Sequence, residues 1–176
     1  MLRKKSKKPK IITFQMQHGE FLYLGKEYKI VGPIENADMK AIWDDFLATD
    51  IDGGYAVIKQ YRKNSYECMI VNHNINSEYE VYSPGTIVDG IDEVPEGWAL
   101  TKFPAREFIV VTHEWISKEE STPIGSCMRY ADNLQIPDGY IRYDQPGSQI
   151  VLMELSNSDS EQRRRWEIWV PIRKTV

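Results

Sequence analysis

The run from Arg165 to Arg173, RWEIWVPIR, constrains the fold of this chain more than any other stretch. It is rich in β-branched and aromatic residues, which favour strands, and side chains on a strand point alternately to its two faces. One face then carries an unbroken apolar set, made of Trp166, Ile168, Val170 and Ile172. We expect that face to pack against a helix.

The opposite face of this strand places Glu167 beside Trp169 and Pro171. A carboxylate that faces a protein interior is costly unless it is paired or neutralised. Glu167 is therefore expected either to reach water or to be kept for a ligand. The simpler alternative is an exposed glutamate on an edge strand, beside a surface tryptophan.

The composition is that of one soluble globular domain. The chain has 176 residues, of which 41% are hydrophobic and 27% are charged, which is enough for a single core. No stretch approaches the roughly 20 apolar residues that a membrane helix requires. Cys68 and Cys127 lack a C-x-x-C spacing and no export signal is evident, so they indicate reduced thiols in a cytoplasmic protein. The histidines share no zinc-binding pattern, so we predict neither a metal nor a cofactor.

The first ten residues differ from the rest of the chain. They carry six of the 22 basic residues and no acidic residue, so the body keeps 16 basic against 26 acidic residues. We expect residues 1–10 to be a solvated, disordered tail and residues 11–176 to form a single domain. Attraction of the tail to nucleic acid is the alternative, but an acidic body repels phosphates, so a nucleic-acid partner is not expected.

Apolar residues at helical spacing predict one clear helix, and they are Met39, Ile42, Trp43, Phe46 and Leu47. Asn36 is the expected N-cap of this helix. Two short strands are expected before it, within residues 11–34. A second, weaker helical stripe follows Pro123 and stops at Pro137.

Alternating residues predict a hairpin, with strands Tyr55–Tyr61 and Tyr66–Asn72 joined by a turn at residues 62–65. Its tyrosines either line a wet, ligand-accepting cavity or are ordinary half-exposed strand residues. Residues 76–93 are expected to form a loop or a small ribbon. Residues 98–103 and 107–115 predict a second antiparallel pair, and strands at 149–155 and 165–173 close the chain.

The closing run EIWVPI, Glu167–Ile172, resembles the last strand of the GyrI-like, or AraC-type effector-binding, domain family of bacterial transcription regulators. Other segments follow in that family's order. Ile42–Phe46 resembles its first-helix W-x-x-F segment, residues 55–71 its tyrosine-rich hairpin, Val94–Trp98 its P-E-G signal, and Phe103–Phe108 its I-P-A-x-x-Y signal. The match covers about residues 26–174. It implies a duplicated α+β fold, in which two helix-plus-hairpin units form a curved sheet with a central ligand groove.

The resemblance also implies an aromatic pocket with an acidic residue at its base, often for lipophilic or cationic compounds such as multidrug ligands. The matching acidic residue here is Glu167. The aromatic residues that would surround it are Trp43, Tyr55, Tyr61, Tyr66, Trp98, Phe108 and Trp169. Residues 76–93 make a longer connection than is usual in the family, so they are expected either to cover or to fill the mouth of the pocket.

Three functions remain open. A standalone domain of this kind is first expected to bind a lipophilic or cationic small molecule, because aromatic faces attract cations by about 0.5–2 kcal/mol each. Some standalone members resemble hydrolases of electrophilic compounds, in which case Glu167 is the general base and Trp43 or Trp169 holds the substrate. A family namesake inhibits a DNA topoisomerase, so a protein-interaction module is the third. No fused DNA-reading domain is expected, so the chain is not predicted to be a transcription factor by itself.

Overall fold

The computed structural model describes residues 10–32, 36–48, 53–63, 68–74, 79–117, 123–143, 149–156 and 163–175. Within these ranges the chain forms eleven strands and three helices. In chain order they are β1 (Ile11–His18), β2 (Phe21–Gly25), β3 (Tyr28–Val31), α1 (Met39–Phe46), α2 (Gly54–Tyr61), β4 (Cys68–Asn74), β5 (Tyr79–Val88), β6 (Ala99–Phe103), β7 (Arg106–His113), β8 (Ile116–Ser117), α3 (Ile124–Asp132), β9 (Tyr140–Arg142), β10 (Gln149–Ser156) and β11 (Arg163–Lys174).

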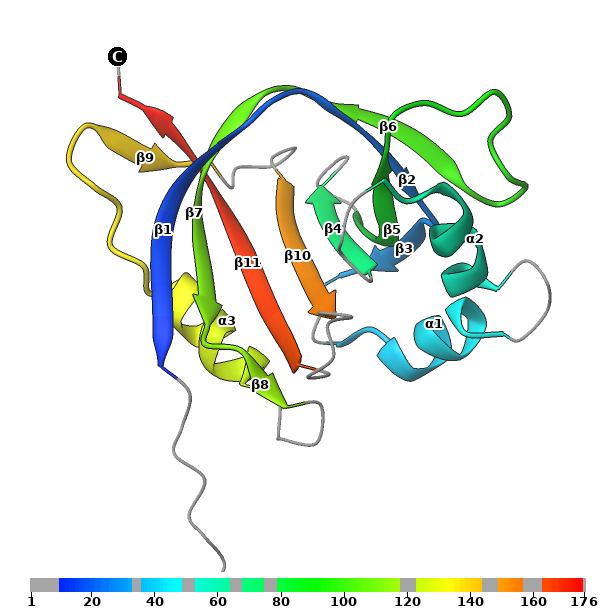
Figure 1. The fold of residues 1–176 in the computed structure, drawn as a ribbon, viewed down its shortest axis with the longest axis horizontal. Coiled ribbons are helices and arrows are strands. Elements are labelled where there is room, and N and C mark those ends of the chain that lie inside the picture. The colour runs from blue at the N-terminus through cyan, green and yellow to red at the C-terminus, as the bar shows by residue number, and fades with distance from the viewer. Residues whose placement is uncertain are drawn as a thin grey trace, which may run out of the picture.

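One curved antiparallel sheet organises the molecule, and β11 lies in its interior (Figure 1). The main strand order is β1-β7-β11-β10-β4-β5-β2-β6; β3 pairs with β5, while β8 and β9 pair with β11. The fold contains two units, each made of helical residues and an antiparallel hairpin. The first consists of α1 and α2 with β4–β5, and the second consists of α3 with β10–β11. This arrangement confirms the predicted α+β fold of two helix-plus-hairpin units.

The two faces of β11 have the environments that its alternating sequence predicts. Ile168 and Val170 pack against Cys127 and Ala131 of α3. Trp169 points to the other side, into a buried cluster that also holds aromatic residues of β2, β6 and β7. We call these sides the helix face and the aromatic face of the sheet.

The same division continues on β4, three strands along from β7. Met69 and Val71 pack in the aromatic cluster with Trp169. Cys68 and Ile70 instead pack with buried residues of α1 and α2. All three helices therefore lie against the helix face.

A long bent ribbon joins the two halves of the sheet. Residues Ile11–His18 pair with Arg106–His113, and Phe21–Gly25 pair with Ala99–Phe103. The ribbon bends between these pairings, at residues 19–20 and 104–105, and arches over the top of the view in Figure 1. The bend brings β2 and β6 of one half against β7 and β11 of the other, in a single aromatic cluster.

The predicted strand at Tyr55–Tyr61 is wrong, because these residues lie in α2. The buried positions of α2 are Gly54, Val57 and Ile58, which is the spacing of a helix. A Cβ atom at Gly54 would collide with the ring of Phe46, so the glycine lets α2 approach α1 closely. The expected partner strand exists as β4, but it pairs with β5 and β10. Tyr66 lies outside the described residues.

Two further predictions about strands are wrong. Residues 79–88, expected in a loop or small ribbon, form the long strand β5, which pairs with β2, β3 and β4. Residues 99–103 and 106–113 do form strands, but β6 pairs with β2, while β7 pairs with β1 and β11. The chain crosses from one half of the sheet to the other between them, so they do not close a hairpin.

The N-terminal third needs two smaller corrections. Residues 11–31 form three strands, where two were expected. The helix α1 is confirmed, but its N-cap is Asp38 and not Asn36, because the Asp38 carboxylate accepts a hydrogen bond from the Ala41 amide over 3.0 Å.

Candidate functional site

Glu167 is buried on the aromatic face of β11, and both of its carboxylate oxygens accept hydrogen bonds. Its exposed fraction is 3%. The indole Nε1 of Trp169 donates to Oε2 over 3.0 Å, and Nη2 of Arg165 donates to Oε1 over 2.8 Å. The three side chains alternate along one strand and so share a face. An ion pair and an indole N–H therefore offset the cost of burying this charge.

Arg165 is the accessible partner in this ion pair. Its side chain is 26% exposed, against 4% for that of Glu167. Its guanidinium carbon lies 4.7 Å from the centre of the Trp115 ring, a distance at which a cation and an aromatic face attract. Nε of Arg165 is buried without a hydrogen-bond partner. The site thus combines a buried carboxylate, an aromatic ring and a cation supplied by the protein itself.

Aromatic rings pack around Trp169, next to the carboxylate. Trp169 is fully buried, and the centre of its ring lies 5.4 Å from those of Phe108 and His18. Tyr23 belongs to the same cluster, and its hydroxyl donates to the Ser83 carbonyl oxygen over 2.6 Å. Burial is the main cause that raises the pKa of Tyr23. The residues around Trp169 therefore form a rigid aromatic layer.

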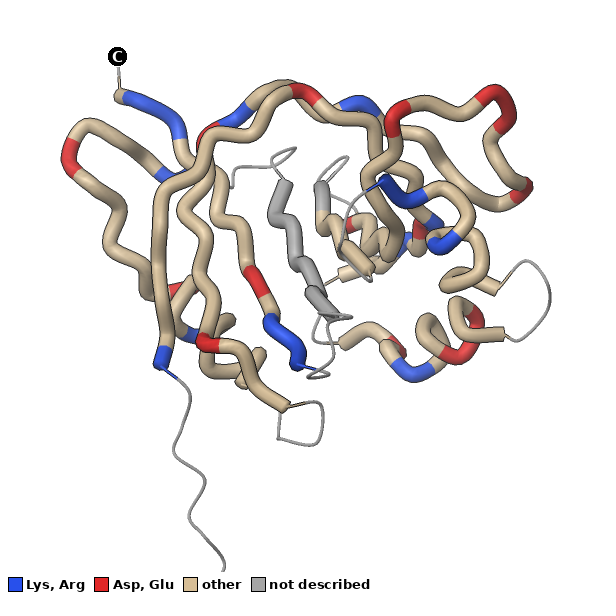
Figure 2. The backbone as a smooth tube through the Cα atoms, in the orientation of Figure 1, with Lys and Arg blue, Asp and Glu red and all other residues tan. Residues whose placement is uncertain are grey.

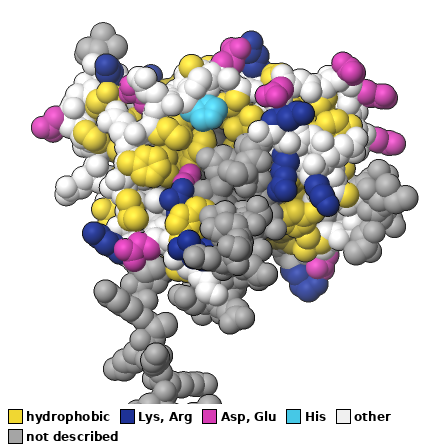
Figure 3. Space-filling model, in the orientation of Figure 1, with side chains coloured by type: hydrophobic (Ala, Val, Ile, Leu, Met, Phe, Trp, Pro, Cys, Tyr) yellow, Lys and Arg dark blue, Asp and Glu magenta, His cyan; other side chains and the backbone are white. Residues whose placement is uncertain are grey.

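The strand register extends this site toward β1. Glu167 lies opposite Thr112 of β7, which in turn lies opposite Ile12 of β1. Trp169 lies in the neighbouring row, two strands away from Phe14. Residues directly opposite one another point to the same face of a sheet. Ile12 and Phe14 are 39% and 42% exposed, so accessible apolar surface borders the buried carboxylate. Figure 3 shows hydrophobic side chains gathered where β1 and β7 lie.

A second group of predicted residues surrounds Phe46 on the helix face. The ring centres of Trp43, Tyr55 and Trp98 lie 5.4, 5.7 and 6.1 Å from that of Phe46. Phe46 is fully buried, and the three rings around it are half-buried. The Trp43 side chain also hydrogen-bonds to Tyr82, although burial dominates and raises the pKa of Tyr82 to about 12.

The structure divides the predicted site residues between the two faces of the sheet. On the aromatic face lie Phe108, Glu167 and Trp169. On the helix face lie Trp43, Tyr55, Tyr61 and Trp98. The sheet separates the two groups at β4, where Met69 packs with Trp169 and Ile70 packs with Phe46.

Two residues of this region were missed from the sequence. Arg165 stands two positions before Glu167, on the same face of the strand, so the alternation that singled out Glu167 also points to it. His113 gave no such signal. It is fully buried, its Nε2 accepts a hydrogen bond from the Trp166 amide over 3.0 Å, and its Nδ1 donates to the Glu114 carbonyl oxygen over 2.7 Å.

These two bonds fix the neutral tautomer of His113, since Nδ1 must carry the proton and Nε2 must not. Burial is the main cause that lowers the pKa of His113, and the positive charges of Arg165 and Arg164 act in the same direction. His113 therefore anchors β7 to β11 and does not serve as an acid or base at the Glu167 site.

Within the described ranges, no group of three His, Cys, Asp or Glu side chains could hold a metal ion. None of the described helices is long and apolar enough to cross a membrane. Cys68 and Cys127 are both buried, and neither forms a disulfide.

The sequence matches no protein-family model and no curated protein. Solved structures nevertheless share its fold. SAV2435 bound to tetraphenylphosphonium is similar with a TM-score of 0.68 and 8% identity, over 92% of this chain and 94% of that one. A putative bacterial transcription regulation protein from Staphylococcus aureus MU50 is similar with a TM-score of 0.65 and 8% identity, over 92% of this chain and 98% of that one. The EcmrR C-terminal domain is similar with a TM-score of 0.52 and 12% identity, over 94% of this chain and 99% of that one.

The chain has the GyrI-like effector-binding fold. The order of motifs in the sequence agrees with this result. The closing EIWVPI run of the GyrI-like resemblance lies on the central strand β11, and its W-x-x-F segment lies on α1. At such low identities the likeness establishes the fold alone, so the ligand has to be argued from the residues of this chain.

Proposed function

We propose that this GyrI-like domain binds lipophilic cations on its aromatic face, with Glu167 as the counter-charge. The observation that carries the proposal is the Glu167–Arg165 pair, in which a buried carboxylate holds a cation that is stacked on Trp115. A ligand cation in the place of the guanidinium would meet the same charge and the same ring. Ile12 and Phe14 offer exposed apolar surface for its lipophilic part. SAV2435, which has this fold, is solved with tetraphenylphosphonium.

Binding would proceed as an exchange of cations. Arg165 is partly exposed, so its guanidinium can move into water, whereas Glu167 stays buried. A buried carboxylate that loses its partner is strongly destabilised, so the ligand and Arg165 would compete for Glu167. The hydrogen bond from Trp169 would remain in place and keep the carboxylate oriented.

The predicted aromatic contacts have unequal support. Trp169 donates a hydrogen bond to Glu167 and its ring packs on that of Phe108, on the same face of the sheet, so we propose these two rings as the aromatic wall of the site. Trp43, Tyr55, Tyr61 and Trp98 remain predictions from the resemblance, because they pack on the helix face. Trp43→Phe keeps an apolar ring there, and unchanged ligand affinity in this variant would assign the helix-face group to packing.

The test is titration with tetraphenylphosphonium, followed by tryptophan fluorescence and calorimetry. Glu167→Gln keeps the size of the side chain and removes its charge, so we expect affinity to fall about 10–100-fold, or about 1.4–2.8 kcal/mol. Glu20→Gln is the matched control, because Glu20 is paired with Lys102 at 2.8 Å but is exposed. Equal affinity in wild type, Glu167→Gln and Glu20→Gln would exclude Glu167 from the site.

Two further measurements sharpen the result. Triphenylphosphine oxide has a similar shape but no net charge, so its affinity should not distinguish wild type from Glu167→Gln. Arg165→Gln removes the competing cation, and we expect tetraphenylphosphonium to bind this variant more tightly. Weaker binding to Arg165→Gln would contradict the exchange of cations.

Hydrolysis is the alternative for the same residues. A general base needs access to water, whereas Glu167 is buried and is held by Trp169 and Arg165. The geometry therefore favours binding. Turnover of an electrophilic ester that disappears in Glu167→Gln, with little change in the affinity of the neutral substrate, would reverse this order. Co-purification of a protein partner would instead support the interaction module.

A further inference from the structure

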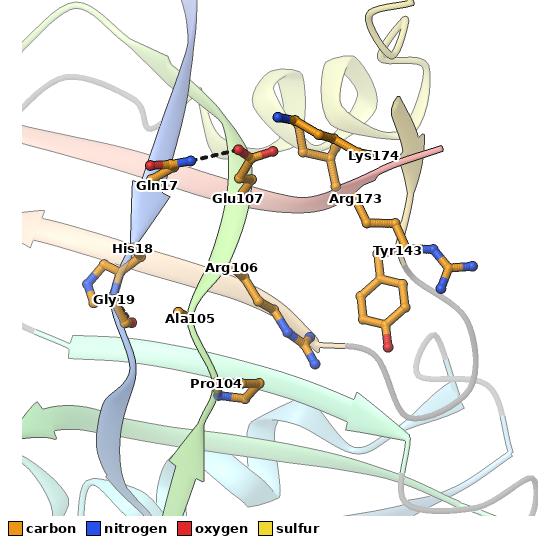
Figure 4. Close-up of a pocket in the computed structure, with 11 residues that line it drawn as sticks. Gln17, His18, Gly19, Pro104, Ala105, Arg106, Glu107, Tyr143, Arg173 and Lys174 are labelled. Carbon is orange, nitrogen blue, oxygen red and sulfur yellow. Dashed lines mark hydrogen bonds between the residues drawn. The ribbon is translucent and has the colours of Figure 1, made fainter. Parts of the chain in front are cut away.

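A groove lies at the bend of the ribbon, where β1 ends and β7 begins (Figure 4). Its volume is about 740 Å³, which is in the range of small-molecule sites, about 300–1,000 Å³. Its lining comes from the bend itself, from the end of β11 and from Tyr143, which follows β9. None of the residues proposed for cation binding lines this groove.

The groove is lined by more positive than negative charge. Arg106, Arg173 and Lys174 line it, together with one carboxylate, that of Glu107. Oε1 of Glu107 already accepts a hydrogen bond from Nε2 of Gln17 over 2.8 Å. The whole chain has a formal net charge of −4. Figure 2 shows basic residues at both ends of β11, while acidic residues lie along α1 and the loop between β5 and β6. The groove is thus a basic site on an acidic protein.

Two guanidinium groups share the ring of Tyr143. The guanidinium carbons of Arg106 and Arg173 each lie 4.9 Å from the centre of that ring, which Figure 4 shows between them. The ring attracts both cations, and it holds two like charges, which repel each other, in the same groove. An anion in the groove would relieve this repulsion.

Arg106, which lines the groove, also has an unused hydrogen-bond donor. Its Nη1 is buried and has no hydrogen-bond partner. Buried donors in folded proteins are nearly always paired, and an unpaired one is costly. A guanidinium group presents its N–H groups as a planar fork that fits the two oxygens of a carboxylate or phosphate. An oxyanion is therefore the best match for the unpaired Nη1 donor of Arg106.

We propose that this groove binds a small organic anion through its phosphate or carboxylate group, with Arg106 as the fixed donor and Arg173 as the accessible one. The volume accommodates a group larger than the oxyanion alone. This site is separate in residues and opposite in charge preference from the cation site at Glu167, so each can exist without the other.

Calorimetric titration with inorganic phosphate, phenyl phosphate and benzoate tests this site, against sodium chloride at equal ionic strength. We expect saturable binding at one site for at least one of these anions. Arg106→Gln should weaken that binding at least tenfold. Tighter binding of phenyl phosphate than of benzoate would identify the ligand as a phosphate, and the reverse would identify a carboxylate.

Two variants make the result decisive. Lys29→Gln is the control, because Lys29 is also a cation stacked on a tyrosine, 4.5 Å from the centre of the Tyr79 ring, but lies outside the groove. Its affinity should equal that of wild type. Arg173 is exposed, so Arg173→Gln should fold even if Arg106→Gln does not, and it should also weaken binding. Unchanged affinity in Arg173→Gln, or heats no larger than those of sodium chloride, would overturn the proposal.

Discussion

At the scale of single residues, two buried ionisable groups differ in the partners that hold them. Glu167 and His113 lie near one another on opposite faces of the β7–β11 pair. Glu167 is paired with the partly exposed side chain of Arg165. Both ring nitrogens of His113 are bonded to the backbone, so protonation of this residue would break a bond between two central strands.

This leads to a prediction about pH. The pKa of His113 is lowered in the folded protein, so below an unfolded-state value of about 6.5 the unfolded chain takes up a proton that the folded chain refuses. The free energy of unfolding should then fall as pH decreases from about 6.5, until the pH drops below the folded-state pKa. One such group contributes a slope of at most about 1.4 kcal/mol per pH unit.

His113→Gln provides the comparison, because glutamine keeps a donor and an acceptor but does not titrate. Urea unfolding measured from pH 8 to pH 5 should give a shallower decline for His113→Gln than for wild type. Parallel curves would show that His113 contributes nothing to the acid sensitivity of the fold.

At the scale of elements, close approach of backbones explains several strands and helices. Gly85 of β5 lies opposite Gly25 of β2, and the hydroxyl of Tyr23 lies above this pair. A Cβ atom at Gly85 would collide with the carbonyl oxygen of Leu24 and lie 2.7 Å from Cα of Gly25. These neighbours are backbone atoms of a paired strand, so they cannot move aside as a flexible side chain would.

We therefore expect Gly85→Ala to destabilise the protein by about 1–3 kcal/mol, the usual cost of overpacking. A Cβ atom at Gly90 would meet nothing within 4 Å, so Gly90→Ala should change stability by less than about 0.5 kcal/mol. Chemical denaturation of both variants checks this difference. Equal stabilities would mean that β2 and β5 are more loosely packed than described.

The same packing shows where sequence patterns are sufficient and where they are not. The apolar stripe of α1 repeats with the helical period because one side of the helix is packed. Both faces of β11 are buried, but its residues alternate between the helix face and the aromatic face, so period two is still visible. In α2, Tyr55, Val57 and Tyr61 alternate as in a strand, yet the buried side chains are those of the adjacent residues Val57 and Ile58. Only the contact with α1 decides between a strand and a helix here, and that contact cannot be predicted from a single sequence.

Strand β5 and the candidate site show the same limit. Ser83, Pro84 and Gly85 have the composition of a turn, but Gly85 serves close packing against β2. Glu167 and Trp169 could be singled out because they are two positions apart on one strand. The basic groove could not, since Arg106, Tyr143 and Arg173 come from segments that only the folded sheet brings together.

At the scale of the whole molecule, one cluster unites both halves of the sheet. Trp169 and Val110 come from β11 and β7, while Phe21, Tyr23 and Met69 come from β2 and β4. Neither half keeps this cluster buried without the other. We therefore expect a single cooperative unfolding transition, with coincident midpoints by tryptophan fluorescence and far-ultraviolet circular dichroism. Separate midpoints would show that the two halves unfold independently.

The central place of β11 also affects how the chain folds as it is synthesised. Until residues 163–174 are made, β7 and β10 lack the strand that lies between them, and among the described strands only the bent ribbon joins β1 and β7 to the rest of the sheet. The ribbon itself pairs Ile11 with His113 and so depends on contacts between distant residues. Such contacts form slowly, and the edges of the unpaired strands stay exposed until they have formed. The nascent protein is therefore most open to aggregation just before its last strand emerges.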